Sequence, residues 1–193
     1  MGGESPALGE PPLTAETALE LASLPDLVGR ELGPTPWLEV TQERVDAFAR
    51  SADDTQWIHT DRRRAAAGPF GTTIAHGFLT LALAVRFWDE LVRLEDVRLT
   101  VNYGLNRVRF PAAVPTGSRI RGRLRVHEVA EIEAGAQATI GVTIELEGAT
   151  KPACVAELVL RFPTVGLAGG AGRSRPRARC ARRRRPPGCH LGR

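Results

Sequence analysis

Apolar residues follow a helical period in the first half of the chain. They recur three and four positions apart over residues 45–52, and Thr41 stands just before this segment as an N-cap residue. Asp53 and Asp54 favour turns over helix interiors, so this first helix is predicted to end near them. A second helix is predicted over residues 76–94. Its first three turns are apolar nearly all round, the pattern of a helix that is surrounded by protein.

Beyond the second helix the period changes to that of strands, in which every second residue is apolar. The change is clearest where Ile120, Leu124 and Val126 alternate with arginines. Strands are predicted at residues 97–103, 107–110, 118–129, 137–147 and 153–162. Two weaker segments precede them. Residues 14–24 fit a short amphipathic helix, and residues 55–74, which contain GPFGTT, fit a loop.

The order of these elements predicts the fold class. One long buried helix is followed by a run of antiparallel strands with one solvated face, which indicates an α+β protein. The sheet covers such a helix most economically by curving around it. We therefore expect a hot-dog fold, in which a long central helix is wrapped by a curved antiparallel β-sheet.

The net charge of +4 is unevenly distributed along the 193 residues. The tail from Arg173 carries nine of the 26 basic residues and no acid. The rest of the chain has 17 basic and 22 acidic residues, a charge of about −5. An acidic body argues against a folded nucleic-acid-binding domain. Cys154 is the one cysteine of three outside this tail, so no disulfide framework is expected.

We divide the chain into three parts by composition. Residues 1–27 form an N-terminal extension, partly disordered, residues 28–165 the folded domain, and residues 166–193 a disordered Arg/Pro/Gly-rich tail. The tail fits either an arm for an anionic partner or an unstructured appendage, which we favour. No apolar run reaches the length of a transmembrane helix, and the N-terminus lacks the pattern of a signal peptide. A cytoplasmic protein without membrane association is expected.

Candidate chemistry is concentrated in two short segments, from Asp54 to His59 and at His76-Gly77. An aspartate and a histidine on one turn can both hydrogen-bond a single water, and positioned proton transfer contributes about 10²–10⁴-fold to a rate. Backbone N–H groups at a helix start stabilise an oxyanion, and Gly77 would supply one. Adding water to carbon 3 of an enoyl thioester requires these groups. No metal site is expected, because the histidines and cysteines show no ligand spacing.

These two segments read ADDTQWIHTD and GPFGTTIAHGFLTLAL, and they resemble the signature of the MaoC-like dehydratases. This family includes the (R)-specific enoyl-CoA hydratases and a NodN-like subgroup. The segments VNYGLNRVRFPAAVPTGSRIR and KPACVAELVLRF resemble the same subgroup, so the resemblance covers roughly residues 28–163. Gln56-Trp57 stands where the broader signature has Asn-Pro, and Ala52-Asp53 replaces its Gly-containing turn. Neither difference removes an acid–base group.

The resemblance implies a lyase, an enoyl-CoA hydratase that reversibly converts a trans-2-enoyl-CoA to the (R)-3-hydroxyacyl-CoA. Asp54 and His59 match the catalytic pair, and Gly77 matches the glycine whose amide contributes to the oxyanion hole. No cofactor is implied, because CoA is part of the substrate. A homodimer is implied, with the substrate tunnel between its subunits. Substrate contacts are expected from Gln56, Trp57, His76, Arg62 and Arg107. The two arginines are candidates for contact with the CoA phosphates.

Four alternatives to the hydratase remain open. A thioesterase of the same fold would release free CoA thiol. A hot-dog acyl-thioester binding module, or a dehydratase acting on acyl-carrier-protein thioesters, would leave an enoyl-CoA unhydrated. A nucleic-acid binder acting through the arginine tail would bind less tightly with added salt and lose binding on truncation at Val165.

Overall fold

The computed structural model describes residues 17–133 and 135–163. Its elements are, in chain order, β1 (Thr17–Leu19), the 3₁₀ helix η1 (Leu21–Leu27), β2 (Glu31–Leu32), β3 (Leu38–Glu39), α1 (Gln42–Ala52), α2 (Trp57–Thr60), α3 (Arg62–Ala66), α4 (Gly77–Leu91), β4 (Val92–Leu94), β5 (Val101–Arg109), β6 (Arg119–Ile132), β7 (Gly135–Leu146) and β8 (Cys154–Pro163).

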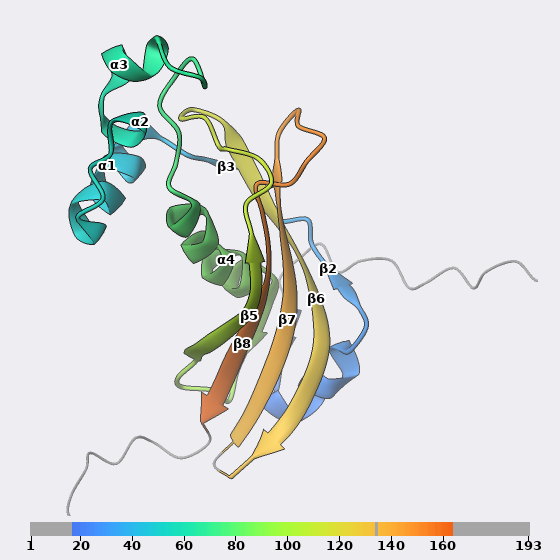
Figure 1. Cartoon of the computed structure of the whole chain (residues 1–193). Coiled ribbons are helices and arrows are strands. Elements are labelled where there is room, and N and C mark those ends of the chain that lie inside the picture. The colour runs from blue at the N-terminus through green and yellow to red at the C-terminus, as the bar shows by residue number, and fades with distance from the viewer. Residues whose placement is uncertain (1–16, 134, 164–193) are drawn as a thin grey trace, which may run out of the picture.

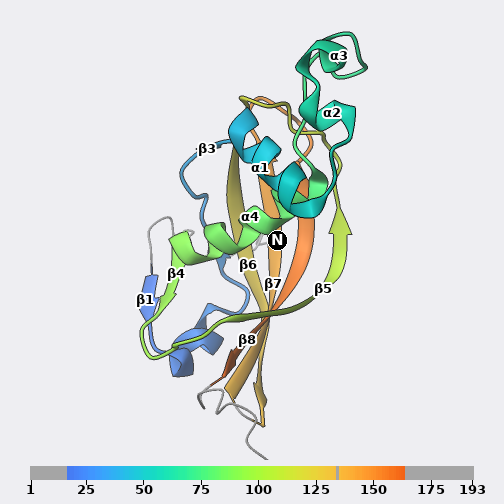
Figure 2. The same ribbon diagram turned by 90° about the vertical axis from the view of Figure 1, so that its left-hand side faces the viewer.

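An antiparallel sheet forms the larger layer of the molecule. Its strands lie in the order β2-β6-β7-β8-β5, and β3 also pairs with β6. The long strands β6, β7 and β8 are hydrogen-bonded over most of their length. The sheet is curved and α4 lies across one face of it (Figure 1, Figure 2). The helices α1, α2 and α3 gather at one end of the molecule, beyond the first turn of α4 (Figure 1).

The core lies between α4 and the sheet. On β7, every second residue over 136–144 is buried, because successive side chains of a strand point to opposite faces. Phe87 of α4 is fully buried against inward-facing residues such as Ile120 and Ile140. The other face of the sheet carries ion pairs from β6, namely Arg121–Glu145 and Arg123–Glu145 to β7 and Arg119–Glu147 to the residue that follows β7. The arrangement is the α+β hot-dog fold that the sequence predicts.

One glycine allows α4 to approach the sheet closely. Gly122 of β6 lies beneath Phe87, and a Cβ atom at residue 122 would be 2.6 Å from both Cβ and Cγ of that phenylalanine. Gly122 also exchanges two hydrogen bonds of 2.9 Å with Thr35: its N–H donates to the Thr35 hydroxyl, and its carbonyl accepts from the Thr35 N–H. The segment at Thr35 is therefore bonded to β6 at Gly122, and α4 lies so close to the strand that residue 122 has no room for a side chain.

The first helix follows its prediction. α1 begins after Thr41, whose hydroxyl accepts a hydrogen bond from the N–H of Arg44 at 3.4 Å. It ends at Ala52, and Asp53 follows in the left-handed conformation with a φ of 53°. The strands predicted at residues 118–129, 137–147 and 153–162 are confirmed as β6, β7 and β8.

The amphipathic helix predicted at residues 14–24 is wrong. The chain instead forms β1, which pairs in parallel with β4, and then η1. Leu21, Leu24 and Leu27 of η1 are buried, and their spacing of three residues matches the turn of a 3₁₀ helix. These leucines belong to the same core as the sheet. The division of the chain after residue 27 stays a prediction.

The loop predicted at residues 55–74 is also wrong in part, because α2 and α3 lie within it. Asp61 caps α3 through its carboxylate, which accepts from the N–H of Arg64 at 2.9 Å. An aspartate before a run of helix-forming residues is an N-cap signal that the loop interpretation overlooked.

Two further boundaries differ from the prediction. The second helix was expected over residues 76–94, but it ends at Leu91, and the next three residues form β4. The two short strands expected at 97–103 and 107–110 are one strand, β5, whose pairing with β8 shifts register twice. Those irregularities interrupt the alternation by which strands are recognised in a sequence.

Residues 1–16 of the N-terminal extension, and residues 166–193, predicted to be a disordered tail, lie outside the described residues. Among the helices of residues 17–133 and 135–163, none combines the length and apolar character that crossing a membrane requires.

Candidate active site

Three titratable side chains meet where α1, α2 and α4 come together. Asp54 follows the C-terminus of α1, His59 lies on α2, and His76 is the N-cap residue of α4. Each of the three offers one oxygen or nitrogen atom within 4.8 Å of the others. The structure thus brings together the segments that the sequence singled out, although 17 positions separate the two histidines.

His59 is held in one tautomer. It is 7% exposed, and its Nδ1 lies 2.7 Å from the carbonyl oxygen of Ile74. A carbonyl only accepts hydrogen bonds, so Nδ1 carries the hydrogen and the neutral ring keeps its lone pair on Nε2. Burial lowers the pKa of His59 below its ordinary value; the carbonyl of Ile74 raises it, nearby His76 lowers it, and Asp54 raises it. The net lowering favours a neutral ring that can accept a proton.

His76 lies next to both His59 and Asp54. Its ring is stacked on that of His59 with the ring centres 3.7 Å apart, and it is 2% exposed. Its Nε2–H donates to the main-chain oxygen of Asp54 at 2.9 Å and lies 3.9 Å from the Asp54 carboxylate. Phe48 of α1 packs against the same ring. The ring of His76 thus supports the main chain of Asp54 and the ring of His59, and the substrate contact that the sequence predicts for it stays a prediction.

Asp54 is the exposed member of the cluster. Its side chain is 54% exposed, while both histidine rings are buried. The exposed carboxylate of Asp54 and the buried neutral ring of His59 are thus two neighbouring proton acceptors, one in contact with solvent and one shielded from it. A water between them would be hydrogen-bonded by both.

Gly77 is the first residue of α4. The first N–H groups of a helix have no intrahelical partner and lie at the positive end of the helix dipole, which suits a developing oxyanion. A Cβ atom at residue 77 would lie 3.0–3.1 Å from three ring atoms of Phe110. Any residue other than glycine at this position would therefore crowd the ring of Phe110.

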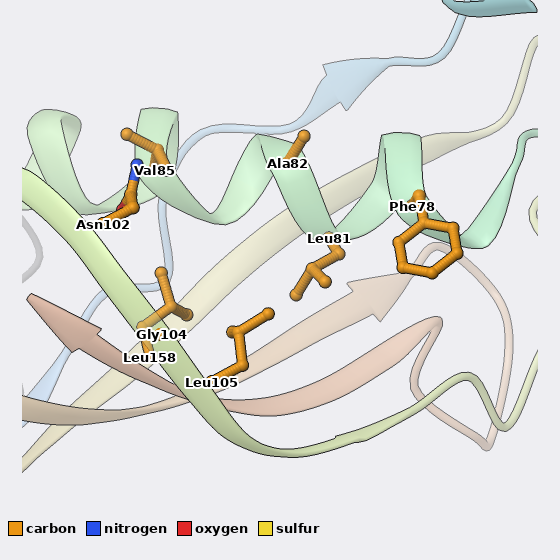
Figure 3. A pocket seen from close by; sticks show the side chains of 8 residues that line it. All are labelled: Phe78, Leu81, Ala82, Val85, Asn102, Gly104, Leu105 and Leu158. Atoms are coloured by element: carbon orange, nitrogen blue, oxygen red, sulfur yellow. The ribbon is translucent and has the colours of Figure 1, made fainter. Parts of the chain in front are cut away.

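An apolar groove of about 470 Å³ is lined by Phe78, the residue that follows Gly77. It runs between α4 and β5 and is lined by Phe78, Leu81, Ala82, Val85, Asn102, Gly104, Leu105 and Leu158. In Figure 3, Phe78 and Leu81 project from α4 toward Leu105 on β5. Phe78 is 70% exposed, so the groove is open along part of its length. The resemblance predicts a substrate tunnel, but the sequence does not give its walls, because α4 and β5 are separate segments and neither pattern shows that they lie side by side.

The other predicted substrate contacts lie around the cluster rather than in it. Gln56 is exposed at the N-cap of α2, and its side chain makes no capping hydrogen bond. Trp57 is half-buried under the guanidinium of Arg64, 4.5 Å from the ring centre, and does not line the groove. Arg62 borders a separate surface pocket beside α1, and Arg107 is exposed on β5. Their roles stay predictions.

The distances within the cluster of Asp54, His59 and His76 would suit a metal ion, but the orientation of the rings does not. A ligating imidazole holds the metal in its own plane at about 2.0–2.1 Å. The rings of His59 and His76 are tilted by only 23° and their centres are 3.7 Å apart. The planes of two such rings do not intersect within bonding distance of both nitrogens, so one ion could not lie in both planes. The geometry suits proton transfer better. That no metal is needed stays a prediction.

Cys154 offers no alternative nucleophile. It is fully buried on β8, and burial raises the pKa of its thiol to about 11. The thiolate is the nucleophilic form, so this cysteine is inert at neutral pH.

Comparison with known proteins agrees with the resemblance. A family model described as MaoC like domain matches residues 23–147. The 3-hydroxyacyl-thioester dehydratase Z of Mycobacterium tuberculosis (strain ATCC 25618 / H37Rv) is 50% identical over 150 residues, 77% of this chain and 97% of the relative. Nodulation protein N of Rhizobium leguminosarum bv. viciae is 43% identical over 145 residues, 73% of this chain and 89% of the relative.

Solved structures show the same fold. An unliganded (R)-hydratase from Pseudomonas aeruginosa matches with a TM-score of 0.61 at 23% identity, covering 80% of this chain and 95% of the other. An (R)-hydratase from A. caviae matches with a TM-score of 0.57 at 23% identity, covering 70% and 96%. At these identities the likeness concerns the fold alone.

Proposed function

Because the chain belongs to the MaoC-like dehydratase family, we propose that it catalyses the reversible hydration of a trans-2-enoyl-CoA to the (R)-3-hydroxyacyl-CoA. One observation carries the proposal. The carboxylate of Asp54 and the ring of His59 meet beside His76, the N-cap residue of α4, and Phe78 in the first turn of that helix lines the apolar groove. An activated water, an oxyanion site and a binding site for an acyl chain are what this reaction needs.

The proposed chemistry is acid–base catalysis. Asp54 and His59 hold a water over carbon 3 of the substrate, and the pair takes one proton from it as the oxygen bonds to that carbon. The electrons of the double bond move onto the thioester oxygen, where the N–H of Gly77 stabilises the enolate. The pair then returns a proton to carbon 2. Water is added without net loss or gain of protons, so the same groups serve dehydration.

The groove accounts for the acyl part of the substrate. Its walls are apolar except for Asn102, and burying alkyl groups there contributes about 0.8 kcal/mol per methylene. The groove starts at Phe78, next to Gly77, so a thioester at the helix start would extend its acyl chain along α4.

A second copy of the chain would close the open side of the groove. β5 lies at the edge of the sheet, and its residues 101–107 are all exposed, with Tyr103 the most exposed large hydrophobic among them at 57%. A nine-residue edge strand with apolar side chains is a template for pairing with another strand. We infer a homodimer formed along β5. Two related solved structures from Mycobacterium tuberculosis are also described as complexes of two proteins.

The molecular mass in solution tests the dimer. Tyr103→Glu on β5 should shift the protein to monomers and lower its activity, since a charge replaces an apolar contact. Val28→Glu is the matched control: Val28 is 46% exposed but lies beside β6, near the other edge. If Tyr103→Glu remains dimeric, the interface lies elsewhere.

The activity is tested with a short trans-2-enoyl-CoA. Hydration removes the conjugated double bond, so absorbance of the conjugated thioester should fall while a thiol reagent detects no free CoA. A dehydrogenase specific for (R)-3-hydroxyacyl-CoA should then oxidise the product. Thiol release would indicate a thioesterase instead. Absence of turnover with short and long chains, in a folded dimer, would favour an acyl-carrier-protein substrate or a binding module.

A further inference from the structure

Gln42 is a buried polar residue for which catalysis as proposed has no use. It is the first residue of α1, and only 9% of its surface is exposed. Its Nε2 donates two hydrogen bonds of 2.8 Å, one to the carboxylate of Asp46 and one to the main-chain oxygen of His59. Its Oε1 accepts a hydrogen bond from the hydroxyl of Thr73. Both hydrogens of the amide, and its oxygen, are therefore engaged.

The orientation of this amide follows from its partners. The carbonyl of His59 and the carboxylate of Asp46 can only accept, so the NH₂ group must face them. Oε1 then faces Thr73, whose hydroxyl donates to it. Thr73 is itself 1% exposed, and its hydroxyl lies 2.7 Å from that of Thr116. The network joins α1 to two other segments of the chain.

Those two segments are the ones that orient the ring of His59. One is α2, which carries His59 and is held through its carbonyl. The other begins at Thr73 and continues to Ile74, whose carbonyl oxygen accepts from Nδ1 of the ring at 2.7 Å. The N–H of Ile74 also donates to the carbonyl of Ile58 at 2.9 Å. The amide of Gln42 thus connects the same two segments, α2 and the segment at Thr73 and Ile74, that are connected by the hydrogen bond from Nδ1 of His59.

We propose that Gln42 is a positioning residue: by bonding to the His59 carbonyl and the Thr73 hydroxyl at once, it sets the ring of His59 relative to Ile74 and so aims Nε2 at the water. The inference rests on the proposed function, in which His59 exchanges the proton. A misplacement of about 1 Å in such a group costs on the order of 100-fold in rate. Glutamine suits this place because a carboxylate would meet the His59 carbonyl and the Asp46 carboxylate without a hydrogen to donate.

Two pairs of variants test the proposal by steady-state kinetics with a short enoyl-CoA. Gln42→Ala should lower kcat by about 10- to 100-fold and change KM for the thioester by less than about threefold, because the groove is untouched. Thr73→Val should lower kcat in the same way, while Thr73→Ser, which keeps the hydroxyl, should restore it. Ser51→Ala is the control: Ser51 lies on the same helix, exposed, with its hydroxyl bonded to the carbonyl of Ala47.

Gln42→Glu adds a readout that a purely structural role would not give. A carboxylate here is like-charged with Asp46, so its protonated form is favoured, and only that form can donate a hydrogen bond. The activity of Gln42→Glu relative to the unchanged protein should be low at about pH 8 and recover as the pH is lowered toward about 6. A ratio independent of pH would contradict the proposed donor role.

Nitrogen NMR of the imidazole separates this inference from the proposed function, because it needs no substrate. In the unchanged protein the signals of His59, assigned by their loss in His59→Ala, should report a hydrogen on Nδ1. In Gln42→Ala they should report a mixture of tautomers, since the carbonyl of Ile74 is no longer held in place. If the tautomer and kcat both stay unchanged in a folded Gln42→Ala protein, the inference is overturned. If the unchanged protein lacks hydratase activity but the tautomer shifts, the proposed function fails and the positioning role stands.

Discussion

The contact of Gly122 with Phe87 gives a quantitative test of the packing that positions α4. In Gly122→Ala the new methyl carbon would lie 2.6 Å from two carbon atoms of Phe87, and within 2.8 Å of a third. Carbon atoms in ordinary contact are about 3.5–4.0 Å apart, so the overlap is roughly 1 Å. Phe87 is fully buried, and one of the atoms is its Cβ, which cannot move without the helix.

Overpacking of this kind costs about 1–3 kcal/mol, and we expect the upper part of that range because neither neighbour can turn away. For a protein of this size each kcal/mol lowers Tm by about 2–4 °C, so Tm should fall by roughly 4–12 °C. Thermal unfolding followed by circular dichroism, at one fixed protein concentration, measures the change, since the stability of a dimer depends on concentration.

Gly104→Ala is the matched control for this substitution. Gly104 also lies in a strand of the sheet, but no atom stands within 4 Å of the position of its Cβ. Because β5 is also the proposed dimer edge, both substitutions are compared in the monomeric Tyr103→Glu background, where the Tm of Gly104→Ala should stay close to that of its parent. Equal Tm values for both variants would refute the close approach of α4 to β6 and, with it, the placement of Gly77 at the head of the groove.

Three further predictions concern the protonation of His59, the role of Gly77 and the burial of Cys154. Burial lowers the pKa of His59 in the folded protein, so below the ordinary pKa of about 6.5 the unfolded chain binds a proton that the folded protein does not. The free energy of unfolding, measured by chemical denaturation, should therefore decrease as the pH falls from about 6.5 to the lowered pKa. In a His59→Gln protein this decrease should be smaller. Gly77→Ala should fold normally, because the half-exposed ring of Phe110 can move away from the new methyl group. It should lose at least about tenfold in kcat/KM, because a methyl group and a displaced ring at the helix start would crowd the proposed oxyanion site. An unchanged kcat/KM would argue against that site. With the other two cysteines replaced by serine, Cys154 should react with a thiol reagent only on unfolding, and rapid labelling of the native protein would contradict its burial.

The elements that the sequence predicted correctly have signals confined to short stretches of chain. α1 has its N-cap at Thr41 and its turn residue at Asp53, and buried positions alternate over residues 119–127 of β6 and 135–145 of β7. β5 was divided in two because its register shifts remove the alternation. The helix predicted at residues 14–24 was wrong because apolar residues three positions apart fit an α-helix and a 3₁₀ helix alike.

The predicted site residues that the structure brings together are those joined by a recognisable spacing. Asp54, His59 and His76-Gly77 converge as expected. Gln42 gave no signal, because a glutamine at the first position of a helix is ordinary at a surface, and its burial arises only when α2 and the segment at Thr73 pack over it. The groove depends in the same way on the placement of β5 beside α4.

The most direct test of the central claim compares two neighbouring aspartates. Asp54→Asn and His59→Ala should each lower kcat/KM for a short trans-2-enoyl-CoA by about 10²–10⁴-fold, since each removes one of the groups that hold and deprotonate the water. Asp53→Asn should stay within about threefold of the unchanged protein, because asparagine accepts the left-handed conformation of residue 53 and that residue has no part in the proposed chemistry. An Asp54→Asn protein that hydrates the thioester at the unchanged rate, or an equal loss in Asp53→Asn, would contradict the account.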